Sequence, residues 1–396
     1  MTTLLCDAIA DAGRTQALAL ACSVEPGTPG VAELVSEHGV SDALARIRGR
    51  RRSGPVAGRL EPADIPGMLT EMARRGVRVV LPGEPGFPSQ LLDLPEPPLA
   101  LWVSGPLDLR AAALRSVAVV GARACTAYGE RATGVIAGGL GQDGWAVVSG
   151  AAFGIDAAAH RAALAVGGQT IAVLACGVDV AYPRSHDALL ARIADSGLVV
   201  SELPPNSQPL KHRFLARNRV IAALSRGTVV AEAARRSGAV ATASRALELG
   251  RVVMAVPGPI TSMASAGTNR LLHEQSARAV SDSAEVVSLL VASGASPDPL
   301  PGADPASVDA AGADAAGVDS AGADSAGAGF AEGGARLAGM PADARAIHSV
   351  LPGRGARSLE SAAAAAGVAP ASALAHLGLL ELAGLARRTG AGWRRL

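Results

Sequence analysis

The sequence is poor in aromatic side chains and in lysine. Its 396 residues include four phenylalanines, three tryptophans and two tyrosines, and Lys211 is the only lysine among 36 cationic residues. Apolar residues nevertheless make up 49% of the chain, so we expect a sizeable core built from Ala, Val, Leu and Ile. No run of 18 or more apolar residues lacks a charge or a helix breaker, which excludes a typical transmembrane helix. Residues 1–7 show no basic segment before an apolar one, so no signal peptide is expected.

Paired cysteines are also missing. Cys6, Cys22, Cys125 and Cys176 are scattered, with no two of them in a C-x-x-C motif. This spacing argues against a disulfide framework and against a structural zinc site. We therefore predict no metal centre, and we expect a cytoplasmic protein.

Charge is balanced overall, with a net charge of +1, but it is unevenly distributed. Residues 295–335 contain acids and no base, and Asp309, Asp314, Asp319 and Asp324 recur every five residues in Ala, Gly and Ser. A segment without large side chains cannot bury a core, so it is predicted to be a disordered acidic linker. A five-residue structural repeat is the alternative. Residues 336–396 are basic, yet no part of the chain is basic enough to indicate nucleic-acid binding from charge alone.

Residues 106–294 alternate short apolar runs with segments of helical character. The runs are Val117–Val120, Ala146–Val148, Thr170–Leu174, Leu198–Val200, Thr228–Ala231 and Val252–Val256. Runs that are apolar at every position predict parallel strands covered by helices on both faces. The fold class expected is therefore α/β, with a doubly wound, Rossmann-like domain. Its ligands should bind where the strands end.

The two ends of the chain show other patterns. Residues 1–105 begin with helical patterns and form a predicted N-terminal helical region. A stretch broken by Pro and Gly follows, with a short strand predicted over 77–81 and an extended segment over 99–103. Residues 336–396 predict a helix over 342–351, a second helix that begins after Ser358, a third over 371–384, and then a hairpin. Three helices followed by a hairpin are typical of a winged helix.

Glycine-containing turns follow the first two strands of the domain. Gly121 and Arg123 precede Thr126 and a helix, and Gly150 and Gly154 precede another. Glycine lets a ligand approach the backbone, and a helix N-terminus favours phosphate. The motif G-x-G-x-x-G is absent, which disfavours a dinucleotide site. Arg123 can grip a phosphodiester, although it could also be a surface residue of an ordinary turn.

Three polar residues close to strand ends admit catalytic or structural interpretations. Asp156 and His160 are four residues apart on one helix face, and we interpret them as structural partners that hold the loop rather than as a general base. Glu232 ends the fifth strand. It could act in a nucleotide-cleaving enzyme, or it could support the loop by anchoring Arg217 or Arg219.

The segment from Lys211 to Arg219 holds the densest group of functional side chains. Its cations can track a phosphate backbone, Phe214 can stack on a base, and Asn218 can read a base edge. The alternative is the start of a basic amphipathic helix. Tyr182, which follows the third strand, could stack, hydrogen-bond or pack beneath its loop. Loops at the last two strands also suit phosphate. The full set of predicted DNA-binding residues is Gly121, Arg123, Thr126, Gly150, Gly154, Lys211, Phe214, Arg217, Asn218, Arg219, Ser237, Gly238 and Asn269.

Together these motifs resemble the DNA-processing protein A family, also called DprA or Smf. The resemblance spans residues 115–282 closely, and its most specific stretches are Val117–Arg123, Ser149–Gly150 with Gly154–Asp156, Phe214 with Arg217–Ile221, Ser237–Gly238 and Val256–Gly258. It implies an N-terminal region of the helix-hairpin-helix or SAM type. It also implies a protein without known catalysis or cofactor that binds single-stranded DNA, dimerises through the Rossmann-like domain and loads the recombinase RecA in natural transformation. Arg123, Lys211, Phe214, Arg217, Asn218 and Arg219 would face the DNA.

Two other functions remain open at this stage. A phosphoribohydrolase would use Glu232, but such enzymes carry a Pro-Gly-Gly-x-Gly-Thr loop where this chain has Pro257-Gly258-Pro259. A transcription factor would act through residues 336–396, whose arginines suit duplex DNA. It would not need the phosphate-shaped loops of the larger domain.

Overall fold

The computed structural model describes residues 2–50, 64–294, 342–352, 356–368, 385–389 and 392–395, with single positions at 373, 376, 377 and 380. The chain divides into two compact units, Met1–Ala303 and Asp304–Leu396, and each is described by itself. The predicted acidic linker over 295–335 lies outside the described residues. In the described part of the chain, no helix is both long enough and apolar enough to span a membrane.

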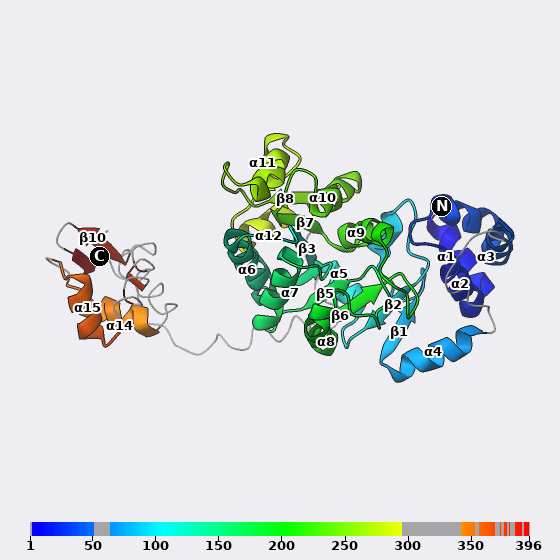
Figure 1. The fold of residues 1–396 in the computed structure, drawn as a ribbon, viewed down its shortest axis with the longest axis horizontal. Helices are drawn as coiled ribbons and strands as arrows, with labels where there is room; N and C mark the ends of the chain where they lie inside the picture. Colours follow the sequence, from blue (N-terminus) through cyan, green and yellow to red (C-terminus); the bar gives the residue numbers. More distant parts are fainter. Residues whose placement is uncertain are drawn as a thin grey trace, which may run out of the picture. The chain divides into compact units, whose positions relative to one another are not determined.

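A nine-stranded sheet forms the centre of the first unit, with the strand order β1-β2-β6-β5-β4-β3-β7-β8-β9 (Figure 1). The six apolar runs predicted from the sequence are all strands of this sheet, which confirms a mixed α/β fold dominated by parallel strands. The parallel strands are β3 (Ser116–Gly121), β4 (Ala146–Ser149), β5 (Thr170–Val173), β6 (Leu198–Ser201), β7 (Gly227–Glu232), β8 (Val252–Ala255) and β9 (Arg278–Ala279). Antiparallel β1 (Val77–Val80) and β2 (Leu101–Ser104) extend the sheet beyond β6.

Helices cover both faces of the sheet because its strands are apolar on both sides. In β3, Val117 and Val119 pack against α6 (Ala127–Gln142), α7 (Ile155–Ala165) and α12 (Ser283–Ala292). Ala118 and Val120 belong to a second core with α9 (Lys211–Leu224) and α10 (Gly238–Glu248). The remaining elements of this part are α5 (Leu109–Leu114), α8 (Asp187–Ser196), α11 (Ala266–His273), η2 (Ser89–Asp93), η3 (Arg184–His186) and η4 (Met263–Ser265).

The order of the strands creates a switch point between β3 and β7. From β3 the chain continues through β4, β5 and β6 on one side, and α9 then leads to β7 on the other side of β3. The connections that leave β3 and β7 therefore diverge at the carboxyl edge of the sheet. Open α/β sheets bind their ligands in the crevice at such a point.

The N-terminal helices are α1 (Thr2–Ala12), α2 (Arg14–Ala21), α3 (Val31–Arg50) and α4 (Ile65–Arg74). Their apolar side chains share one core with β1 and β2, in which Leu18, Val35, Val79 and Trp102 are buried. The sheet thus begins before residue 106, where the sequence placed the boundary of the Rossmann-like domain. The two strands match the short strand and the extended segment predicted over 77–81 and 99–103, but the sequence assigned both segments to the N-terminal region and not to the sheet.

The second unit contains α14 (Ala342–Val350), α15 (Leu359–Ala366) and a hairpin of β10 (Ala386–Thr389) and β11 (Gly392–Arg395). The second helix begins after Ser358, as predicted, and Ser358 caps α15, because its hydroxyl accepts a hydrogen bond from Ser361 N at 3.3 Å. Most of the predicted third helix over 371–384 lies outside the described residues, so the winged helix stays a prediction.

Candidate nucleic-acid interface

An open pocket of about 640 Å³ lies at the carboxyl end of β3. It is the switch-point pocket, and its walls come from the turn after β3, from α9 and from the first turns of α10. Eight of the thirteen residues predicted to bind DNA line it. They are Gly121, Arg123, Lys211, Phe214, Arg217, Asn218, Ser237 and Gly238.

Arg217 supplies a buried positive charge to this pocket. Its side chain donates from Nη1 to Val173 O, while its Nε is buried and has no hydrogen-bond partner within the described part of the chain. Burial lowers the pKa of the guanidinium, and the nearby Asp156 opposes that shift. An arginine remains charged despite such a shift. A buried cation that lines a pocket suits an anionic ligand.

The carboxylate of Asp156 organises the backbone around Arg217. It accepts hydrogen bonds from Gly150 N at 3.2 Å and from Ala152 N at 3.4 Å. Burial raises the pKa of Asp156, although Arg217 and the backbone N–H groups counteract the shift. The predicted role of Asp156 as loop support agrees with these contacts.

Aromatic rings lie beside the cations of the pocket. The Arg123 guanidinium carbon is 5.3 Å from the centroid of the Phe214 ring, and the Tyr182 ring is 5.4 Å from the same centroid. Lys211 is exposed, and no ion pair engages it in the described structure. A half-buried ring flanked by cations can stack on a base while the cations bind phosphate.

The N-terminus of α10 forms the opposite wall. Ser237 caps this helix by accepting a hydrogen bond from Val240 N at 3.3 Å. Asn218 of α9 donates from Nδ2 to Gly238 O at 3.2 Å, which fixes the two helices to each other. The first N–H groups of a helix lack partners within it and carry a partial positive charge, so this wall also suits phosphate.

Gly150 and Gly154 lie beneath the pocket and do not line it. A Cβ atom at Gly150 would collide with the Arg217 guanidinium, and a Cβ atom at Gly154 would collide with Ala122 O. Gly154 also has a φ of +75°, which favours glycine. Gly154 therefore allows close packing against the turn after β3, and Gly150 allows close packing against Arg217 of α9.

Thr126 and Glu232 form a pair outside the pocket. The buried Glu232 carboxylate accepts hydrogen bonds from Thr126 N at 2.8 Å and from Thr126 Oγ1 at 2.7 Å. Thr126 in turn caps α6. Glu232 thus supports the loop after β3, and its partner is Thr126 rather than Arg217 or Arg219.

His160 and Asn269 serve as structural residues elsewhere. His160 Nδ1 lies 2.7 Å from Thr170 Oγ1, which itself donates to Val147 O at 2.7 Å. The histidine therefore supports the β4–β5 region, and no hydrogen bond joins it to Asp156. Burial lowers the pKa of His160 to about 3, and the charge of Arg217 adds to this effect. Asn269 holds the loop after β8 by two hydrogen bonds to the backbone of Gly258, at 3.1 and 3.0 Å.

Arg219 lies away from the pocket, on a different side of α9. It forms an ion pair with Glu202 at 2.5 Å and donates to Glu96 O at 2.6 Å. Its side chain is 11% exposed. The structure thus places Arg219 among contacts within the protein, whereas the sequence grouped it with the DNA-facing side chains.

Ten of the eighteen lining residues were not selected from the sequence as binding residues, and three of them had a signal that could have identified them. Tyr182 lines the pocket, and its position at a strand end was the available signal. Leu215 and Thr242 also line it, four residues after Lys211 and Gly238 respectively. Helical spacing from those two residues could have identified both. Among the described residues, no group of three or more His, Cys, Asp or Glu side chains could hold a metal ion.

Comparison with known proteins gives consistent matches. The sequence profile of the family described as DNA recombination-mediator protein A matches residues 78–291. A DNA processing protein, DprA, of Mycobacterium tuberculosis is 39% identical over 387 residues, which cover 94% of this chain and 92% of the relative. The DprA protein of Streptococcus pneumoniae is 46% identical over 188 residues, which cover 48% of this chain and 66% of the relative. The X-ray structure of the S. pneumoniae protein is similar with a TM-score of 0.56 and 33% identity, over 69% of this chain and 93% of that one.

Proposed function

This chain belongs to the DNA recombination-mediator protein A family, and on that premise we propose that it binds single-stranded DNA in the switch-point pocket. The observation that carries the proposal is that one pocket is lined by the buried Arg217, the exposed Arg123 and Lys211, and the Phe214 ring that lies against Arg123. Phosphate would bind the cations and the N-terminus of α10. A base would stack on the ring.

The proposed ligand is single-stranded because of the ring. In a duplex the faces of the bases are stacked on one another, so a side chain cannot reach them without unstacking. Stacking on an aromatic ring tolerates every base, because each base has a π-face. The pocket should therefore bind single strands with little sequence preference.

The wider role is proposed on the basis of the family. The bound strand would be handed to RecA in the cytoplasm during natural transformation or recombination, and the protein would act as a homodimer joined through the Rossmann-like domain. Addition of this protein should then shorten the lag of RecA filament formation on single-stranded DNA. Its oligomeric state can be measured by light scattering.

The enzyme alternative finds no support in the position of Glu232. This carboxylate is 1% exposed and accepts two hydrogen bonds from Thr126, so it does not face the pocket. Binding and transfer of a strand require no bond to be made or broken, and we propose that the protein is not an enzyme.

A competition experiment tests the proposed ligand. A fluorescein-labelled oligothymidylate of about 20 nucleotides, longer than a typical site for one binding module, is bound to the protein and displaced by unlabelled single strand or by unlabelled duplex. We expect single strands of any composition to compete at far lower concentration than duplex. Equal competition by duplex would contradict the proposal, and would favour a duplex-binding site instead.

A further inference from the structure

A loop of the N-terminal helical region holds the start of α9. Glu25, between α2 and α3, binds Arg213 through two hydrogen bonds, to Nε at 2.9 Å and to Nη2 at 2.7 Å. Its carboxylate also lies 3.2 Å from Nε2 of His212. Paired hydrogen bonds between arginine and carboxylate fix orientation as well as distance. Glu25 therefore fixes the first turn of α9 against the N-terminal helices.

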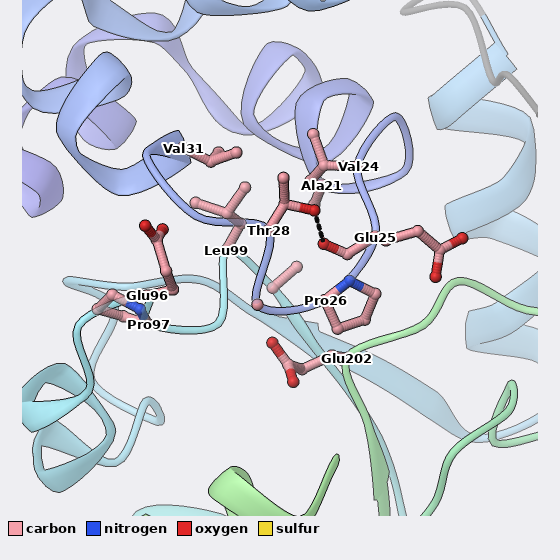
Figure 2. A pocket seen from close by; sticks show the side chains of 12 residues that line it. Ala21, Val24, Glu25, Pro26, Thr28, Val31, Glu96, Pro97, Leu99 and Glu202 are labelled. Atoms are coloured by element: carbon pink, nitrogen blue, oxygen red, sulfur yellow. Dashed lines mark hydrogen bonds between the residues drawn. The ribbon is translucent and has the colours of Figure 1, made fainter. Parts of the chain in front are cut away.

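The same loop contacts α9 again two turns later. Figure 2 shows the loop beside Glu96 and Glu202, the two residues that bind the side chain of Arg219. Gly27 of the loop lies so close that a Cβ atom there would be 2.9 Å from Arg219 Nε. Thr28 stabilises the loop by donating to Glu25 O at 2.7 Å, drawn as a dashed line in Figure 2. The loop and its partners thus hold α9 at two places.

The other side of α9 is a wall of the switch-point pocket, through Lys211, Phe214, Arg217 and Asn218. Arg213 immediately precedes Phe214, and Arg219 immediately follows Asn218. A helix moves as a unit, so a shift of the held side displaces the pocket side too. The contacts made by the loop therefore determine where the cations and the ring of the pocket lie.

We propose that Glu25 is a positioning residue for the nucleic-acid pocket, which couples the seating of the N-terminal loop to single-strand binding. The inference rests on the proposed function of the pocket. Glu25 does not line the pocket and carries the same charge sign as the DNA. It would act through Arg213 and His212 on the position of α9.

An electrostatic effect and a positioning effect predict opposite changes in DNA affinity when this carboxylate is removed. On Coulombic grounds alone, removal of a negative charge near a cationic site should strengthen DNA binding, because Arg213 would be released as a further cation. If Glu25 instead keeps α9 in place, its removal should weaken binding. The sign of the change thus separates the two effects.

The test compares Glu25→Gln and Glu25→Ala with wild type, in the full chain, by fluorescence anisotropy with oligothymidylate. We expect the Kd to rise about tenfold in both variants, within the usual range of coupling between sites. Glu33→Gln is the matched control, because Glu33 is an exposed acid of the same region with no ion pair in the described structure, and it should leave the Kd unchanged. An unchanged or lower Kd in the Glu25 variants would overturn the inference. A wild-type protein that fails to bind would instead overturn the proposed function.

A second measurement uses the wild type alone, so it does not depend on a variant that folds. Coupling is reciprocal, so a strand bound in the pocket should slow amide hydrogen exchange in residues 23–30, although that loop does not line the pocket. Unchanged exchange in that loop at saturating oligothymidylate, with slowed exchange in α9, would overturn the inference and leave the pocket intact.

Discussion

The guanidinium group of Arg217 lies against the backbone of Gly150, where no Cβ atom would fit. Gly150 lies six residues before Asp156, whose carboxylate accepts its N–H. Asp156 and Arg217 line the switch-point pocket, and Gly150 packs against both without lining it. This arrangement gives the first of four predictions.

Gly150→Ala should displace Arg217 and weaken single-strand binding. The φ of Gly150 is not in the left-handed region, so alanine costs little backbone strain, and the side chain that must move is a flexible one. Loss of one charge-assisted hydrogen bond predicts a Kd about tenfold higher. Gly134→Ala, in α6 with open space around it, is the control and should bind as wild type does. Equal Kd values for all three proteins by anisotropy would contradict the role of Arg217.

Phe214→Ala should weaken binding by about 1–3 kcal/mol, the usual value of one base stacked on an aromatic ring. The dependence on salt should stay the same, because the ring carries no charge. Phe214→Trp should keep most of the affinity. Titrations at two salt concentrations check this, and a loss in the tryptophan variant as large as in alanine would argue against stacking.

Lys211→Ala and Arg219→Gln should differ in their salt dependence. Lys211 is exposed at the pocket, so its loss should make the slope of log K against log salt shallower by about 0.7, the value for one phosphate contact on a single strand. Arg219 is held by Glu202 and Glu96, so its loss should leave the slope unchanged even if the affinity falls. If Arg219→Gln reduced the slope as much as Lys211→Ala, the assignment of Arg219 to internal contacts would be wrong.

His160 should make the protein less stable in mild acid. Thr170 donates its hydroxyl proton to Val147 O, so His160 must donate from Nδ1 to Thr170 Oγ1. The buried Nε2 has no hydrogen-bond acceptor among the described residues, so a proton added there would be unpaired. The folded pKa of about 3 lies below the reference value of 6.5, so the unfolded chain binds a proton first as the pH falls. The contribution of His160 to the free energy of unfolding is therefore complete at pH values above the unfolded pKa, and it declines as the pH falls toward the folded pKa.

Between about pH 6.5 and pH 5 the loss from His160 should be about 2 kcal/mol. Urea unfolding of wild type and of His160→Phe at both pH values measures it, because the variant keeps the other titrating groups. If the free energy of unfolding fell no more between these pH values in wild type than in the variant, His160 would not be held neutral in the folded protein.

The parallel strands could be predicted from the sequence because burial on both faces leaves continuous apolar runs such as Val117–Val120. The antiparallel strands β1 and β2 coincide with the short strand and the extended segment predicted over 77–81 and 99–103, but their pairing with the central sheet was not predicted. Their place at the sheet edge depends on the N-terminal helices, which cover Val79 and Trp102. Long-range packing of that kind leaves no local pattern.

The sequence predicted that the residues of α9 cluster at one site, but it did not predict which side of α9 each of them occupies. Sequence proximity placed Arg217 and Arg219 together, yet residues two apart on a helix do not face the same way. Lys211, Phe214 and Asn218 follow helical spacing and do share the pocket. One side of α9 faces Glu25 because Arg213 binds this carboxylate, which is 188 positions away in the sequence. The sequence alone does not show such a contact.

The most direct test of the account is the salt dependence of single-strand binding at the pocket. Fluorescence anisotropy of labelled oligothymidylate would be measured for wild type and for the double variant Arg123→Ala with Lys211→Ala over a series of salt concentrations. The account predicts tight binding by wild type and a slope shallower by about 1.4 in the double variant, which lacks two phosphate contacts. Identical slopes, or no binding by wild type at low salt, would contradict it.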